Sequence, residues 1–161
     1  MNRNERVEDH LSAAQVVAML VETVAKGGNL LLNVGPRGID AQIPDEQLTR
    51  LDWLAEWVTP HARAIAATRP WITPGTTTPD GHPVRYTARD TTVYAFVQGA
   101  TAPITLSEVC ATPTTTVATV DGSALPWKDS PAGIVVDVPA GAAGAGPLVV
   151  ALEQVAARPL G

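Results

Sequence analysis

The stretch of the sequence that most restricts the fold is GGNLLLNVGPRG, at residues 27–38. Three consecutive leucines lie between two asparagines, and glycines precede and follow the run. A short apolar run bounded by turn residues is typical of a strand buried on both faces in the middle of a parallel sheet. Because such a strand needs a hydrogen-bonded neighbour on each side, residues 30–34 predict further parallel strands.

The rest of residues 11–65 has the spacing of helices. Ser12 and Gln15 fit a capping box, and an apolar stripe of helical spacing follows them. A second helix is predicted to begin near Pro44 and to end at Pro60. Its predicted buried face consists of Leu48, Leu51, Leu54 and Val58. Helix, strand and helix form the repeating unit of an α/β layer fold, so we expect this part to be the tail of a larger α/β domain.

The composition changes after Trp71. Residues 72–83, ITPGTTTPDGHP, predict a linker or loop. Short runs with alternating apolar residues follow, and they predict strands of an antiparallel sandwich. These runs are residues 84–88, 93–97, 104–109, 115–120, 134–138 and 148–153.

The charge and cysteine content exclude several classes of function. The chain has 11 basic and 16 acidic residues, and the basic ones form no patch or stripe that would bind nucleic acid. No apolar run is long enough to span a membrane, and the N-terminus is too polar for a signal peptide, so localisation stays open. Cys110 is the only cysteine, and the three histidines have no metal-ligand spacing. We therefore expect no metal or other cofactor, no nucleic acid and no membrane.

Several stretches resemble, in order and spacing, the closing segment of the α-L-fucosidases of glycoside hydrolase family 29. They are residues 2–5 (NRNE), 24–28 (VAKGG), 29–36 (NLLLNVGP), 43–57 and 68–71 (TRPW). Beyond them, residues 92–95, the pair Leu125 and Trp127, and residues 133–136 resemble strands of that family's C-terminal β-sandwich. The resemblance covers nearly the whole chain and is strongest up to Trp71.

The resemblance implies a fold and a reaction. Family members have an α/β barrel followed by a β-sandwich, and they remove terminal α-linked L-fucose with retention of configuration. The implied fold class is α+β: residues 1–71 would be a helix-strand-helix remnant of the barrel, 72–83 a linker, and 84–161 an antiparallel β-sandwich. Retention needs two carboxyl groups about 5 Å apart. In the family these lie before the stretch that resembles residues 2–5, so we expect no catalytic residue here and a chain that is inactive alone.

Asn33 and Arg37 are the best candidates for residues near the substrate, because barrel active sites gather at the C-terminal ends of strands. The simpler interpretation, which the sequence favours, is that Asn33 ties down the loop and Arg37 is a surface charge. Glu5, Glu8 and Asp9 are close together, but solvated acidic residues are common before a helix. The four tryptophans, Trp53, Trp57, Trp71 and Trp127, could stack on sugar rings, although packing is the favoured interpretation.

Two alternatives stay open. The sandwich could be a non-catalytic module that binds carbohydrate or protein, or a separate chain could supply the missing barrel. The expected partners are fucosylated glycans, through the parent enzyme, and either the missing barrel segment or a second copy of this chain. Exposed apolar helix faces and an unpaired strand edge would favour such association.

Overall fold

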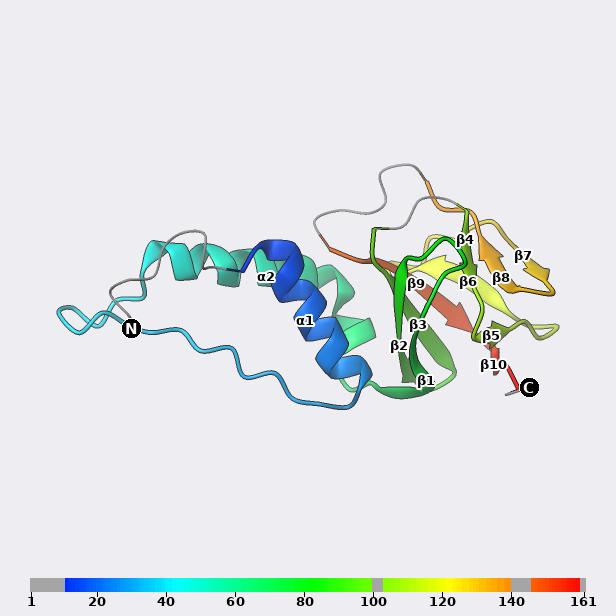
Figure 1. The fold of residues 1–161 in the computed structure, drawn as a ribbon, viewed down its shortest axis with the longest axis horizontal. Coiled ribbons are helices and arrows are strands. Elements are labelled where there is room, and N and C mark those ends of the chain that lie inside the picture. Colours follow the sequence, from blue (N-terminus) through cyan, green and yellow to red (C-terminus); the bar gives the residue numbers. More distant parts are fainter. Residues whose placement is uncertain (1–10, 100–102, 140–145, 160–161) are drawn as a thin grey trace.

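The computed structural model describes residues 11–99, 103–139 and 146–159. Two helices lie beside antiparallel sheets, as Figure 1 shows, and this confirms the α+β class. The elements are α1 (Ala13–Ala25), α2 (Asp45–Ile65), β1 (Arg69–Thr77), β2 (Pro83–Arg89), β3 (Thr92–Val97), β4 (Ile104–Leu106), β5 (Val109–Cys110), β6 (Thr116–Thr119), β7 (Trp127–Ser130), β8 (Gly133–Val136), β9 (Leu148–Glu153) and β10 (Ala156–Ala157). Neither helix is long and apolar enough to cross a membrane.

Helix α1 begins at the predicted capping box. The Gln15 backbone N–H donates to the Ser12 hydroxyl at 3.3 Å, and the Ser12 backbone N–H donates to Gln15 Oε1 at 2.8 Å. Two backbone donors of the first turn are thereby satisfied. The helix ends before Gly27, whose φ of +73° suits a residue without a Cβ. Its buried face consists of Val16, Val17, Val21 and Ala25.

Helix α2 continues past Pro60 to Ile65, so the predicted end at Pro60 is wrong. A proline inside a helix removes one backbone hydrogen bond, but packing of the following turn outweighs that loss. His61 stacks on Trp57 with ring centroids 4.6 Å apart, and Ala64 is fully buried against the sheet. The predicted buried face is also only partly correct, since Leu48 is 41% exposed.

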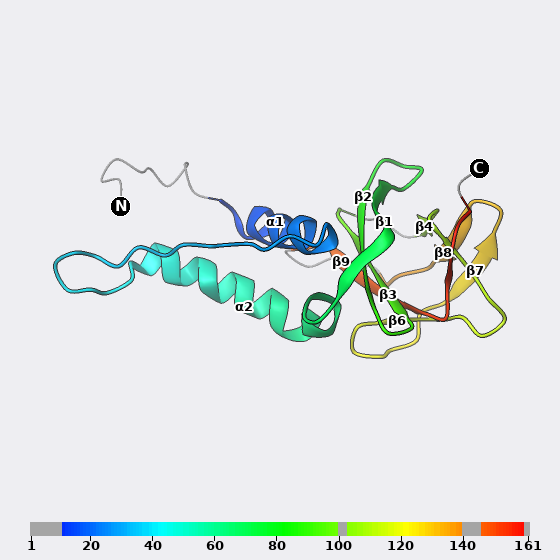
Figure 2. The ribbon, with the colours of Figure 1, turned by 90° about the horizontal axis from the view of Figure 1, so that it is seen from below.

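Residues 28–44 contain no strand, so the strand predicted at residues 30–34 does not form in this chain by itself. The segment leaves α1, runs along the helices away from the sheets, and turns back into α2 (Figures 1 and 2). A strand exists only through a ladder of hydrogen bonds, and no described segment pairs with this one. Leu31 is consequently 82% exposed.

Three antiparallel sheets make up the second half. The largest has the strand order β1-β2-β3-β9-β6, a second has the order β4-β8-β7, and β10 pairs with β5. The predicted run at residues 104–109 is split between β4 and β5. Alternation predicted neither β7 nor β10, although the resemblance had pointed to a strand at Trp127, where β7 begins. The two larger sheets share one core, to which β2, β3 and β9 contribute alternate residues and β4 and β8 the facing ones. Two sheets packed in this way form a sandwich.

Strand β1 corrects the prediction for residues 72–83. Residues 72–77 belong to this strand, which pairs with β2 at both of its ends. The pairing shifts between Pro70 and Gly75, and β1 is the edge of its sheet. Edge strands tolerate prolines because only one side of the strand takes part in the ladder, which explains why a proline-rich stretch forms a strand here. The domain boundaries themselves stay predictions.

The helices cover part of the outer face of the five-stranded sheet. Phe96, Tyr94 and Val149 pack there against Val17 and Val21 of α1, and Ala64 of α2 completes the same cluster. The Thr87 hydroxyl on β2 donates to the Ala64 carbonyl at 2.8 Å and is fully buried. Helices and sheet therefore share a second core beside that of the sandwich.

Candidate functional sites

Arg37 is bound within its own loop. Its Nε lies 3.1 Å from Asp40 Oδ1, and its Nη2 lies 2.6 Å from Asp40 Oδ2 and 3.2 Å from Gln42 Oε1. This two-pronged pair with a carboxylate is the geometry that a guanidinium prefers. The Gly35 N–H donates to Gln47 Oε1 at 2.7 Å and ties the same loop to α2.

Asn33 lies exposed in the extended segment before this loop. Its side chain forms no hydrogen bond within the described part of the chain, and hence none with Arg37. The structure thus gives Arg37 a local role in the turn and leaves Asn33 without one. Their position near a substrate stays a prediction.

Three described carboxyl groups have a pKa that departs from the ordinary value, and in all three the pKa is lowered. The side-chain hydrogen bonds from Lys26 and Arg85 lower the pKa of Glu22. The Thr78 hydroxyl lowers the pKa of Asp80, and the Thr119 hydroxyl lowers that of Asp121. A general acid at neutral pH needs a raised pKa, so these three groups are unsuited to that role.

The remaining sequence candidates give no catalytic site either. Glu5, Glu8 and Asp9 lie outside the described residues. Within the described ranges, no group of three or more histidine, cysteine or acidic side chains is placed to hold a metal ion. Cys110 is free and half-buried in β5, as expected for a small structural residue.

Packing accounts for three of the four tryptophans. Trp57 packs in the core between helices and sheet, and Trp71 and Trp127 pack against the sandwich core. Trp127 pairs with the buried Val136, so its side chain lies on the inner face of its sheet. Trp53 lies beneath the Arg50 guanidinium at 5.6 Å, which is cation–π distance. The packing interpretation favoured by the sequence is confirmed for Trp57, Trp71 and Trp127.

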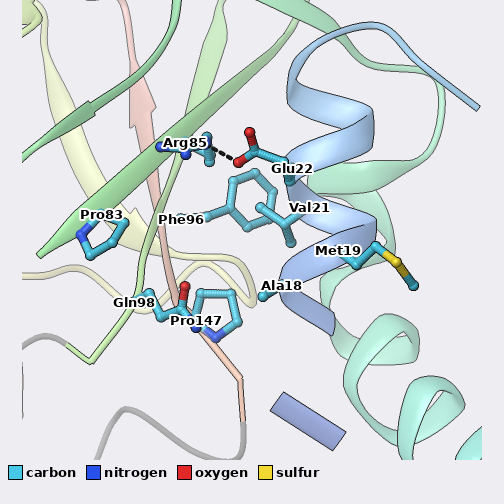
Figure 3. A pocket seen from close by; sticks show the side chains of 9 residues that line it. All are labelled: Ala18, Met19, Val21, Glu22, Pro83, Arg85, Phe96, Gln98 and Pro147. Carbon is cyan, nitrogen blue, oxygen red and sulfur yellow. Dashed lines mark hydrogen bonds and ion pairs between the residues drawn. The ribbon is translucent and has the colours of Figure 1, made fainter. Parts of the chain in front are cut away.

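A cavity of about 290 Å³ lies between α1 and the sheet. Figure 3 shows Phe96 facing it from β3 and the pair of Glu22 and Arg85 closing one end. Arg85 Nε donates to Glu22 Oε2, and Glu22 also pairs with Lys26. Glu22 and Arg85 are 63 residues apart in the sequence, which explains why sequence analysis missed them. Because both are neutralised by each other, they act as a clamp between helix and sheet rather than as a reactive pair.

Known proteins are similar to this chain in sequence and in fold. The family model for α-L-fucosidase matches residues 1–63. The α-L-fucosidase of Branchiostoma floridae is 37% identical over 142 residues, which are 85% of this chain and 31% of that protein. The plasma α-L-fucosidase of Rattus norvegicus is 32% identical over 145 residues, with the same coverage of 85% and 31%.

A crystal structure of Thermotoga maritima α-fucosidase in complex with a mechanism-based inhibitor superposes with a TM-score of 0.84. It is 34% identical, and the match covers 94% of this chain and 36% of that one. The fold and these relatives place the chain in a family of glycoside hydrolases. The chain belongs to the α-L-fucosidase family, glycoside hydrolase family 29, and corresponds to the C-terminal portion of such a protein. It spans about a third of the length of the relatives it matches, 31% in the first two and 36% in the third.

Proposed function

We propose that this chain is the C-terminal part of a retaining α-L-fucosidase that hydrolyses terminal α-L-fucosides. The observation that carries the proposal is the match to the Thermotoga maritima α-fucosidase, which extends over 94% of this chain and spans both the helices and the sandwich. Fucosylated glycans would be the substrates of the complete enzyme. Its stereochemistry is tested by joining this sequence to an upstream barrel and following the first-formed fucose anomer by proton NMR; an inverted anomer would contradict retention.

Residues 1–71 are proposed to close an α/β barrel, with residues 30–34 as its last strand. The exposure of Leu31 (82%) and Ile39 (91%) supports this, because apolar side chains at such exposure suit a covering partner. Asn33 would then lie at the C-terminal end of a barrel strand and Arg37 just past it, where barrel enzymes bind their substrates. In the joined enzyme, Asn33→Ala should raise KM, whereas Asn29→Ala, before the strand, should leave KM unchanged.

The isolated chain is proposed to be inactive. Among the described residues, every carboxyl group with a shifted pKa has its pKa lowered, and a retaining glycosidase needs one whose pKa is raised so that it can act as an acid. We expect the purified chain of 161 residues to release no nitrophenol from an aryl α-L-fucoside above the rate in buffer. Turnover that survives repurification would contradict inactivity without contradicting the family.

The partner proposed for the isolated chain is the missing barrel segment, or failing that a second copy. Leu31, Ile39 and Leu48 offer it exposed apolar side chains on one connected segment and the helix that follows. We expect the molar mass from light scattering to rise with concentration, and Leu31→Asp to suppress that rise. A monodisperse monomer at all concentrations would contradict self-association.

A further inference from the structure

The outer face of the five-stranded sheet is only partly covered. Helix α1 packs over β1 and β2, while β6 forms the opposite edge of the sheet. A hollow of about 250 Å³ lies on that uncovered side, between the last turns of α2 and the β6 edge. It is lined by Arg63, Thr92, Tyr94, Ala118, Ala151 and Glu153, among others.

The register of the strands explains why the sheet is hollow at this point. Ala151 of β9 pairs with Tyr94 of β3 on one side and with Ala118 of β6 on the other. Directly paired residues of an antiparallel ladder share a face, so the two alanine methyl groups lie side by side on the floor. In the next row, Glu153 pairs with Thr92 on one side and with Thr116 on the other. This row forms the polar end of the hollow.

Several polar groups around the hollow have no protein partner within the described part of the chain, and Arg63 and Glu153 among the lining residues are exposed. Among the described residues, the Arg63 guanidinium forms no hydrogen bond or ion pair, and the Tyr94 and Thr92 hydroxyls form no hydrogen bond. Glu153 accepts one long bond of 3.4 Å from the Thr116 hydroxyl. This differs from the cavity in Figure 3, where Glu22 and Arg85 satisfy each other. Unused donors and an acceptor that converge on a small hollow are the arrangement expected of a binding site.

The chemistry of the lining selects among ligands. An anion would meet the Glu153 carboxylate, and a cation would meet the Arg63 guanidinium. A purely apolar ligand would displace water from both charged groups and would not replace the hydrogen bonds that the water had made. A ring that carries several hydroxyls satisfies the donor and the acceptor together and sets its C–H face on the alanine floor. The volume of the hollow, about 250 Å³, suits a single ring, since the pockets that bind drug-sized ligands have volumes of about 300–1,000 Å³.

We propose that this hollow, between Arg63 and the β6 edge, binds one neutral sugar ring. The proposal does not depend on hydrolysis, because the lining residues come from α2 and the sandwich alone. Binding is measured directly on the chain, so its failure leaves the proposed fucosidase function untouched.

The test is a titration of the ¹⁵N-labelled 161-residue chain, followed by NMR, with L-fucose, D-galactose and D-glucose in turn and inorganic phosphate as an anionic probe. We expect at least one sugar to shift the amide signals of Ala118 and Ala151 saturably. Arg63→Ala should weaken this binding about tenfold or more, because it removes hydrogen bonds from a charged donor. Arg89→Ala, an exposed arginine on the same sheet that does not line the hollow, is the matched control and should leave it unchanged.

A second variant fills the hollow. Ala118→Leu places a larger side chain on the floor and should abolish the shifts, while its spectrum reports whether the chain still folds. If it does not fold, the comparison of Arg63→Ala with Arg89→Ala decides. The proposal is overturned by no saturable shift with any sugar, by saturable shifts confined to other residues, by saturation with phosphate alone, or by equal effects of the two arginine variants.

Discussion

The hydrogen bond from the Thr87 hydroxyl to the Ala64 carbonyl is the most direct test of whether helices and sandwich form one folding unit. Thr87 is fully buried, and the bond spans 2.8 Å between residues 23 apart in the chain. Ala64 lies in the last turn of α2, where backbone carbonyls have no partner within the helix. Thr87→Val keeps the shape of the side chain and leaves that carbonyl without its hydroxyl donor.

The expected loss of unfolding free energy is about 1–3 kcal/mol, the cost of a buried group left without its hydrogen bond. The unfolding entropy is about 2.1 cal/mol/K per residue. In a chain of 161 residues, each loss of about 1 kcal/mol from the unfolding free energy therefore lowers the melting temperature by about 3 °C. We therefore expect calorimetry to show a single transition lowered by roughly 3–9 °C.

Thr105→Val is the matched control, since Thr105 lies half-buried on β4 and its hydroxyl forms no hydrogen bond among the described residues. Its melting temperature should change by less than that of Thr87→Val. Two separate transitions, of which only one shifts, would refute the shared core. An unchanged melting temperature for Thr87→Val would refute the role of the hydrogen bond.

Three further substitutions test the junction and α1. Gly75→Ala should displace the Arg85 side chain, because an added Cβ would lie 2.8 Å from its Cδ, and lower stability by up to about 1 kcal/mol in urea denaturation. Glu22→Gln should destabilise at neutral pH but not well below pH 4.5, its ordinary pKa, because a lowered pKa contributes stability that is lost as pH falls. Ser12→Ala should cost about 1 kcal/mol of helix stability by circular dichroism.

Each of these has a control. The effects of Gly75→Ala and Glu22→Gln should not add in the double variant, since both break the same ion pair; full additivity would contradict the clamp. A Glu22→Gln effect that persists unchanged in acid would contradict an electrostatic origin. Ser12→Asp keeps an acceptor at the cap and should retain most of the stability that Ser12→Ala loses.

Local sequence patterns predicted the elements whose causes are local. The capping box of α1 depends on two residues three positions apart, and both hydrogen bonds form. Strands β3, β8 and β9 were predicted from alternation along each strand alone. By contrast, the turn after Pro60 is held by His61 on Trp57 and by Ala64 on the sheet, contacts that no local pattern reveals.

The polar features of the candidate sites were harder to predict because distant residues make them. Glu22 meets Arg85 across 63 residues, and Gly75 gives that arginine the space to reach it. The hollow on the outer sheet depends on Ala118 and Ala151, which are unremarkable in the sequence and become neighbours only through the register of β6 and β9. Arg37 is exposed in this chain and pairs with Asp40, a pairing that the sequence analysis did not predict.

The apolar run at residues 30–34 and the strands β3 and β9 have similar composition but different structures. In β3, Val93, Ala95 and Val97 enter the sandwich core, while Tyr94 and Phe96 enter the core beneath the helices. A strand buried on both faces therefore exists in this chain, within an antiparallel sheet. The leucine run has neither a ladder nor a covering layer here, and Leu31 is exposed. An apolar run becomes a strand only when it pairs with a partner along at least one edge, so the prediction at residues 30–34 becomes a prediction about what binds there.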